Sequence, residues 1–162
     1  MKRLTIAALS GFVGAVTVLG AEQAQAYYED SWEFVCGWEC GEALFEPEYG
    51  GYTVHGYAEV YHSNLPTSEG EAASWAYYDY WLPAGCDQYY SYSAQVVCLD
   101  TAYLHGLSAW EYFSSLYAHL PEEEMACRVI DERAYWRDPY APYVEGWSNR
   151  DADLASVGNC WG

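Results

Sequence analysis

The sequence predicts an all-β fold: a disulfide-stapled, antiparallel, sandwich-like domain with room for one short helix. Three observations support this. Residues 89–99 alternate between apolar and polar side chains with a period of two, as a strand with one buried face does. Residues 74–82 are aromatic on both parities, and aromatic side chains fit a pleated, half-covered surface. Six cysteines follow an N-terminal leader, which is typical of a disulfide framework. An α+β fold is the alternative.

The segment 74–99 (SWAYYDYWLPAGCDQYYSYSAQVVCL) organises the predicted fold. The even positions of its second half are mostly apolar: Tyr90, Tyr92, Ala94, Val96 and Cys98. Between its two halves, Pro83 and Gly85 suit the positions of a tight turn. We therefore expect a β-hairpin, with a helix over residues 74–82 as the alternative.

Residues 1–26 have the composition of a secretory signal peptide. A basic start is followed by an apolar run over residues 4–19 and by Ala24-Gln25-Ala26, a cleavage pattern of small residues. The run is shorter than the ~20 residues that span a bilayer, and a retained anchor helix is the alternative. We therefore expect a mature chain that begins at Tyr27, forms a single domain over residues 27–162, and is secreted to the extracellular space or the periplasm.

Charge narrows the classes of partner. Loss of the leader lowers the basic count from 6 to 4 and the acidic count from 24 to 23, so the mature chain carries a net charge of −19. Such a field repels nucleic acid and anionic membranes, and neither is expected as a partner. The field suits cations, basic proteins or simple solubility in a salty or acidic medium.

The cysteines predict up to three disulfides and no metal site. They are Cys36, Cys40, Cys86, Cys98, Cys127 and Cys160. Three residues separate the first two, and no second pair completes a zinc pattern. The pairing is open except at one point. On an extended strand that rises ~3.3 Å per residue, Cys86 and Cys98 would lie too far apart to bond, so we expect them not to pair.

The other segments are less regular. Tyr27 to Trp38 fits a first strand or a tied-down arm, and Tyr52 to His62 fits a strand with a bulge at Gly56. Residues 101–136 stay open between helix and strand. Apolar residues of the Ala102–Leu120 segment recur at helical spacing and also alternate, and strands are slightly favoured there. Pro121 before three glutamates fits a helix start or the polar tip between two strands.

Motifs for chemistry are absent from the sequence. The spacing of the four histidines brings no two of them together on one element, so no metal site and no cofactor are expected. Asn149-Arg150-Asp151-Ala152-Asp153 begins like a calcium loop, but the required glycine and glutamate are missing. A small secreted hydrolase with paired carboxylates is the alternative function, although 23 acids make chance pairs common.

Aromatic residues carry the functional prediction. The mature chain holds 18 tyrosines and 8 tryptophans, more than one small core can bury. We expect a non-catalytic secreted interaction or structural protein that presents exposed rings to a polysaccharide or an extracellular, cell-surface protein. The candidate ligand-binding residues are Trp75, Tyr77 and Trp81. A secreted inhibitor is a third possibility, and the oligomeric state is open.

Overall fold

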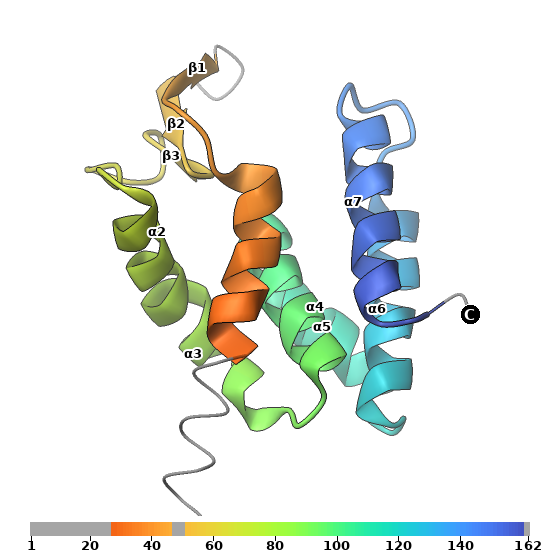
Figure 1. The fold of residues 1–162 in the computed structure, drawn as a ribbon. Helices are drawn as coiled ribbons and strands as arrows, with labels where there is room; N and C mark the ends of the chain where they lie inside the picture. Colours follow the sequence, from red (N-terminus) through yellow and green to blue (C-terminus); the bar gives the residue numbers. More distant parts are fainter. Residues whose placement is uncertain (1–26, 47–50, 161–162) are drawn as a thin grey trace, which may run out of the picture.

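The computed structural model describes residues 27–46 and 51–160 and is mainly helical (Figure 1). A helix over residues 27–39 comes first. Three short strands follow: β1 (Leu44–Glu46), β2 (Gly51–Val54) and β3 (Tyr57–Ala58). The later helices are α2 (Glu69–Ala76), α3 (Leu82–Ala84), α4 (Tyr92–His105), α5 (Leu107–Tyr117), α6 (Glu122–Trp136) and α7 (Val144–Val157). A π-helical turn, η1 (Tyr77–Trp81), joins α2 to α3, and a 3₁₀ turn, η2 (Cys86–Gln88), precedes α4.

The predicted all-β sandwich is therefore wrong. The segment expected as the central hairpin forms α2, η1 and α3 on one side of Gly85 and most of α4 on the other. Gly85 has φ +69°, the left-handed conformation that commonly ends a helix, so it terminates a helix instead of closing a hairpin. Residues 27–38 are helical too. The predicted signal peptide over residues 1–26 lies outside the described residues.

Helix α4 is the centre of the molecule. It packs against α5, α6, α7 and the α2–α3 segment, and every residue from Ser93 to Ala102 is buried. The helix begins at Ser91, whose side chain accepts a hydrogen bond from the backbone N–H of Ala94, an N-cap. Because α4 is covered on all sides, its sequence has no single apolar stripe, and the period of a surface helix is missing.

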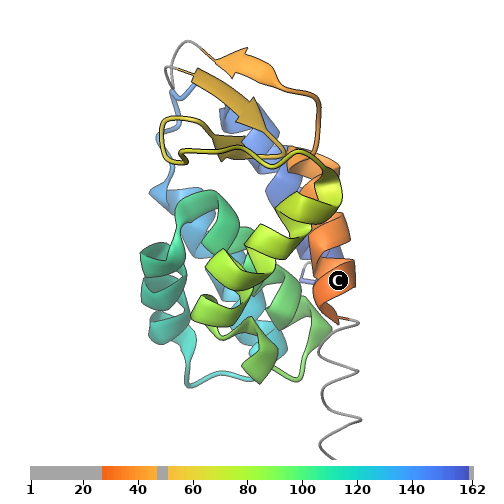
Figure 2. The same cartoon turned by 90° about the vertical axis from the view of Figure 1, so that its left-hand side faces the viewer.

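The sheet lies at one end of the helical body in both views (Figures 1 and 2). Its three strands are antiparallel in the order β1-β2-β3, with Phe45 opposite Tyr52 and Val54 opposite Tyr57. The strand predicted over residues 52–62 is thus a short hairpin. His55 and Gly56 both have positive φ and form its turn, where a bulge was expected. Tyr57 is buried and joins the sheet to the helical core.

All six cysteines are in disulfides, as predicted. The bridges are Cys36–Cys40, Cys86–Cys98 and Cys127–Cys160. The expectation that Cys86 and Cys98 do not pair is wrong. The chain reverses through η2 before α4 begins, and the helix then rises only ~1.5 Å per residue, so the two Cα atoms lie 5.6 Å apart. Within the part of the chain that the structure describes, no helix is both long and apolar enough to cross a membrane.

Candidate functional site

The three predicted ligand-binding residues lie along one continuous helical segment, and two of them, Tyr77 and Trp81, contact the same ring, that of Tyr28. Trp75 is half-buried and meets Tyr57 edge-on, with ring centroids 5.4 Å apart. Tyr77 is half-buried against Tyr28, and Trp81 is 1% exposed in the core. A strand would have placed all three on one face, because they share parity, whereas the helical segment keeps Tyr77 and Trp81 on one side and turns Trp75 toward Tyr57. Their ligand-binding role stays a prediction, and in this conformation Trp81 offers no surface.

Many other large apolar side chains reach solvent. The most exposed rings belong to Phe45, Tyr61, Tyr78, Tyr90, Tyr135, Trp136 and Tyr140. Among the described residues, two pairs of exposed rings contact each other. Phe45 and Tyr52 meet across the β1–β2 ladder, and Tyr112 of α5 meets Trp136 of α6. Contact between exposed rings matters because it restricts their motion before any ligand arrives, which lowers the cost of binding.

The Tyr112–Trp136 pair, here called the α5–α6 platform, has a buried support. The two ring centroids are 5.6 Å apart with their planes tilted by 35°. Beneath them Phe113, which is buried, meets Trp136 edge-on at 5.1 Å. Trp136 is 62% exposed and Tyr112 is 45% exposed. The platform is therefore a fixed aromatic surface that can stack on an apolar face of a ligand.

A hydrogen bond holds the two helices of the platform together. One turn further along, the Tyr117 hydroxyl donates to the Glu132 carboxylate at 2.8 Å. This bond raises the pKa of Tyr117, because the neutral phenol is the form that donates. Position 136 continues the buried stripe of α6 by its helical spacing, so the sequence alone gave no signal that Trp136 would be exposed.

Seven side chains form a buried ion cluster where the first helix, α4, α6 and α7 meet. The acids are Glu39, Asp100 and Asp151, and the basic and neutral members are Arg133, Arg137, Arg150 and His105. Asp100 is paired with Arg133 at 2.6 Å and with Arg150 at 2.7 Å, and both its own side chain and that of Arg133 have no exposed surface. Three of the four arginines of residues 27–162 are thus used inside the molecule.

The ion cluster has the properties of a structural network and not those of a catalytic site. Burial opposes ionisation of Asp100, but the two guanidinium groups outweigh it and hold the pKa of this carboxyl below its usual range. A general acid of a hydrolase needs the opposite shift. Burial and the nearby arginines lower the pKa of His105 to about 3, so its imidazole is neutral and faces the Arg137 guanidinium at 3.5 Å. Arg150 and Asp151, which belong to the stretch that begins like a calcium loop, instead form ion pairs that hold α7 in place.

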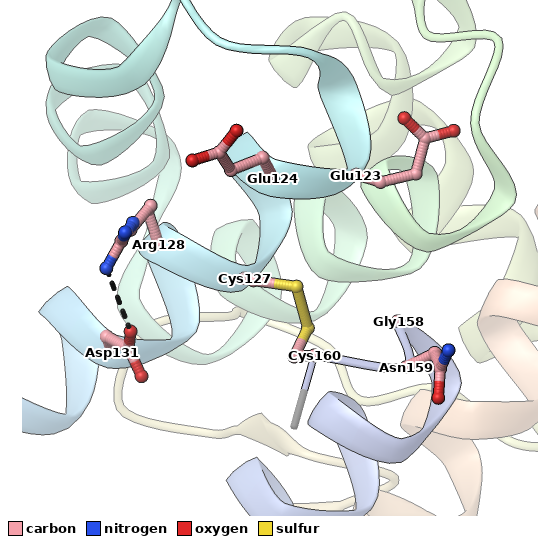
Figure 3. A pocket seen from close by; sticks show the side chains of 8 residues that line it. All are labelled: Glu123, Glu124, Cys127, Arg128, Asp131, Gly158, Asn159 and Cys160. Atoms are coloured by element: carbon pink, nitrogen blue, oxygen red, sulfur yellow. Dashed lines mark ion pairs between the residues drawn. A yellow bond between two sulfur atoms is a disulfide. The ribbon is translucent and has the colours of Figure 1, made fainter. Parts of the chain in front are cut away.

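A hollow of about 320 Å³ lies over the Cys127–Cys160 disulfide, between α6 and the end of α7 (Figure 3). Its rim carries Glu123, Glu124 and Asp131, and Arg128 pairs loosely with Asp131 at 3.9 Å. In Figure 3 the carboxylates of Glu123 and Glu124 point to different sides. The rim is an acidic surface whose side chains do not converge on one point.

Metal-ligand geometry is nearly absent from the described residues. One group of candidate ligands, Cys36, Cys40 and Glu69, has its ligand atoms within 4.8 Å of one another. Both cysteines are joined in a disulfide and have no thiolate to offer. This group therefore does not fit a metal ion.

A second hollow, of about 370 Å³, lies between α5, the start of α6 and the loop before α4. Its lining combines an aromatic ring, two serine hydroxyls, a carboxylate and apolar side chains. No family model, no curated protein and no solved structure matches this chain.

Proposed function

We propose that this protein is a secreted, disulfide-stapled, non-catalytic binding module that uses the α5–α6 platform to bind a neutral polysaccharide. The observation that carries the proposal is the exposed indole of Trp136, held from below by Phe113 and from the side by Tyr112. The face of an aromatic ring is electron-rich, and it attracts the slightly positive C–H groups on one side of a sugar ring.

The size of the platform supports a polysaccharide over a protein. A stable protein interface buries about 800 Å² on each partner around an apolar centre, whereas one aromatic side chain contributes about 150–250 Å². Two partly exposed rings fall well short of such a centre. They suffice to stack one or two sugar units, and repetition along a polymer raises the overall affinity.

Charge supports a neutral polymer. The mature chain carries a net charge of −19, which repels uronic-acid or sulfated polysaccharides. Disulfides and export are the expected setting for such a protein. Three disulfides are present, and they persist in the oxidising environment to which the predicted signal peptide would lead.

The test is co-sedimentation of the mature protein with insoluble cellulose, chitin and starch, and with cross-linked pectate as the anionic polymer. We expect retention on at least one neutral polymer and none on pectate. Trp136→Ala should weaken that retention about 10- to 30-fold, as the loss of an aromatic anchor does.

Tyr140→Ala is the matched control. Tyr140 is 91% exposed, and no ring contact to it is present among the described residues, so retention should stay within about twofold of the parent. Retention by none of the neutral polymers would contradict the proposal. Equal losses in the two variants would contradict the role of the platform.

A further inference from the structure

The hollow beside α5 has a carboxylate that is fixed in place. Oε2 of Glu122 accepts hydrogen bonds from the backbone N–H groups of Tyr90 at 2.8 Å and Ser91 at 2.7 Å. These bonds tie the first turn of α6 to the loop before α4. The other oxygen, Oε1, has no partner among the described residues. Glu122 therefore presents one free acceptor oxygen from a carboxylate that two backbone N–H groups hold in place.

Tyr89 supplies the aromatic wall and a second polar group. Its ring meets the buried Trp110 edge-on at 5.7 Å, which fixes its orientation. Burial, aided by the negative charge of Glu122, raises the pKa of Tyr89, so the phenol keeps its proton at neutral pH. Ser114, whose hydroxyl donates to the Glu111 carbonyl at 3.3 Å, lines the same hollow. The hollow thus has a neutral phenol and a serine hydroxyl in its lining together with Glu122.

The rest of the lining is half apolar and half hydroxyl. Leu120 and Met125 form apolar wall, and Ser115 adds a further hydroxyl at the rim. Pockets of about this volume that combine apolar walls with a few converging polar groups are typical of small-molecule sites. Carboxylate, phenol and hydroxyl groups around an apolar wall match adjacent hydroxyls and a C–H face on one ligand. The fixed carboxylate disfavours anions.

We propose that this hollow binds one neutral hexose unit, with one hydroxyl of the sugar donating to Oε1 of Glu122, a neighbouring hydroxyl at the Tyr89 phenol, and its C–H face against Leu120 and Met125. The proposal rests on the proposed function for its class of ligand. The link is α5, which carries both features. Tyr112 of the platform and Ser115 of the hollow are three residues apart on α5. By contrast, Trp136 and Glu122 are at opposite ends of α6, about 21 Å apart along its axis, so an extended chain of several sugar units would be needed to reach both. One polysaccharide chain can then use the platform for stacking and the hollow for recognition.

The experiment titrates ¹⁵N-labelled mature protein with glucose, galactose, mannose and N-acetylglucosamine and follows backbone amide shifts. We expect saturable shifts at Tyr89, Ser114 and Ser115 for at least one sugar, with a Kd on the order of a few millimolar, as befits a ligand of about 12 heavy atoms. Glu122→Gln keeps an oxygen for the two N–H donors but loses the charge, and it should weaken binding about 5- to 10-fold.

Two further variants keep the test sharp. Tyr89→Phe keeps the ring and removes the hydroxyl, and it should weaken binding about 3- to 10-fold even if Glu122→Gln is poorly folded. Glu123→Gln makes the same charge change at the next residue, which lies on the other hollow, and it should leave the Kd within about twofold.

The outcomes separate this inference from the proposed function. Absence of amide shifts at the hollow with all four sugars overturns the inference, as does a Kd that Glu122→Gln and Tyr89→Phe leave unchanged. If Trp136 still governs retention on a polymer, the proposed function survives that result. Sugar-dependent shifts at the hollow that both variants weaken support the inference, even if no polymer is retained and the platform proposal fails.

Discussion

Replacement of Arg133 by methionine tests the buried ion cluster. The Arg133 side chain has no exposed surface and bonds to Asp100 at 2.6 Å, to Asp151 at 3.0 Å and to the Thr101 hydroxyl at 2.9 Å. Methionine fills much of the same volume but leaves two buried carboxylates with fewer cations. Loss of one partner of a buried pair costs about 3–5 kcal/mol. Most of that cost is the uncompensated charge that stays behind.

Urea unfolding followed by circular dichroism measures the effect. Domains have about 5–15 kcal/mol of stability, so Arg133→Met should remove a large part of it and lower Tm by about 10 °C or more. Arg128→Met is the matched control, because Arg128 is half-exposed and its pair with Asp131 spans 3.9 Å. The control should change stability by less than about 0.5 kcal/mol.

A second variant isolates the cause. Asp100→Asn added to Arg133→Met removes the stranded charge and should restore part of the lost stability. If Arg133→Met costs less than about 1 kcal/mol, or no more than Arg128→Met, the ion cluster does not hold the helices together.

Three other predictions concern pH and the disulfides. The folded pKa of His105, about 3, lies below its usual value of 6.5, so the unfolded chain takes up a proton that the native state refuses. Stability should fall by up to about 1.4 kcal/mol per unit as pH drops from 6 toward 3, and His105→Gln should flatten the curve between pH 6 and 5 in urea titrations. Alanine at both Cys127 and Cys160, which close a 33-residue separation, should cost about 4 kcal/mol in the same assay. Alanine at both Cys36 and Cys40, which are separated by only 4 residues, should lower the free energy of unfolding by about 2 kcal/mol. Equal losses for the two disulfides would contradict the loop-entropy explanation. Light scattering should show the lowest solubility near pH 4, where protonation removes the self-repulsion of the acidic surface, and a flat profile would show that charge does not keep the molecules apart.

The fold was mispredicted because its central helix is buried on every side. Along α4 the small and polar residues Ser93, Gln95 and Thr101 are interior together with the apolar ones, and their order happens to alternate. Alternation within a helix buried all round carries no information on period. By contrast, the first helix did have a usable signal. Tyr28, Ser31, Trp32 and Val35 are buried at spacing i, i+3, i+4 and i+7.

In other elements, local sequence signals did predict the structure correctly. The helix alternative at Pro121 was correct, since α6 begins there with three glutamates in its first turn. Helical spacing also identified Trp110 and Phe113, the buried residues of α5, although strands were preferred for that segment. The existence of three bridges followed from the cysteine count. Their pairing did not, because the distance between Cys86 and Cys98 depends on whether the intervening chain is extended or helical.

For the candidate site, the sequence predicted that aromatic rings would be exposed but not which ones. Exposed aromatic rings followed from the number of tyrosines and tryptophans, but their positions depend on how α5 and α6 pack. Trp136 extends the buried stripe of its helix and is exposed all the same, while Trp81 is buried. The Glu122 carboxylate accepts a hydrogen bond from the backbone N–H of Ser91, 31 residues earlier in the sequence. Local sequence signals do not predict a contact between residues so far apart.

The most direct test of the account is the indole N–H signal of Trp136 in ¹⁵N-labelled protein during titration with a soluble oligosaccharide cut from whichever polymer retains it. We expect the Trp136 indole to show the largest and a saturable shift among the tryptophans, and Tyr112→Ala to reduce the affinity. A ligand that shifts the indole of Trp75 and leaves that of Trp136 unchanged would contradict the account and move the binding surface to the α2–η1 segment.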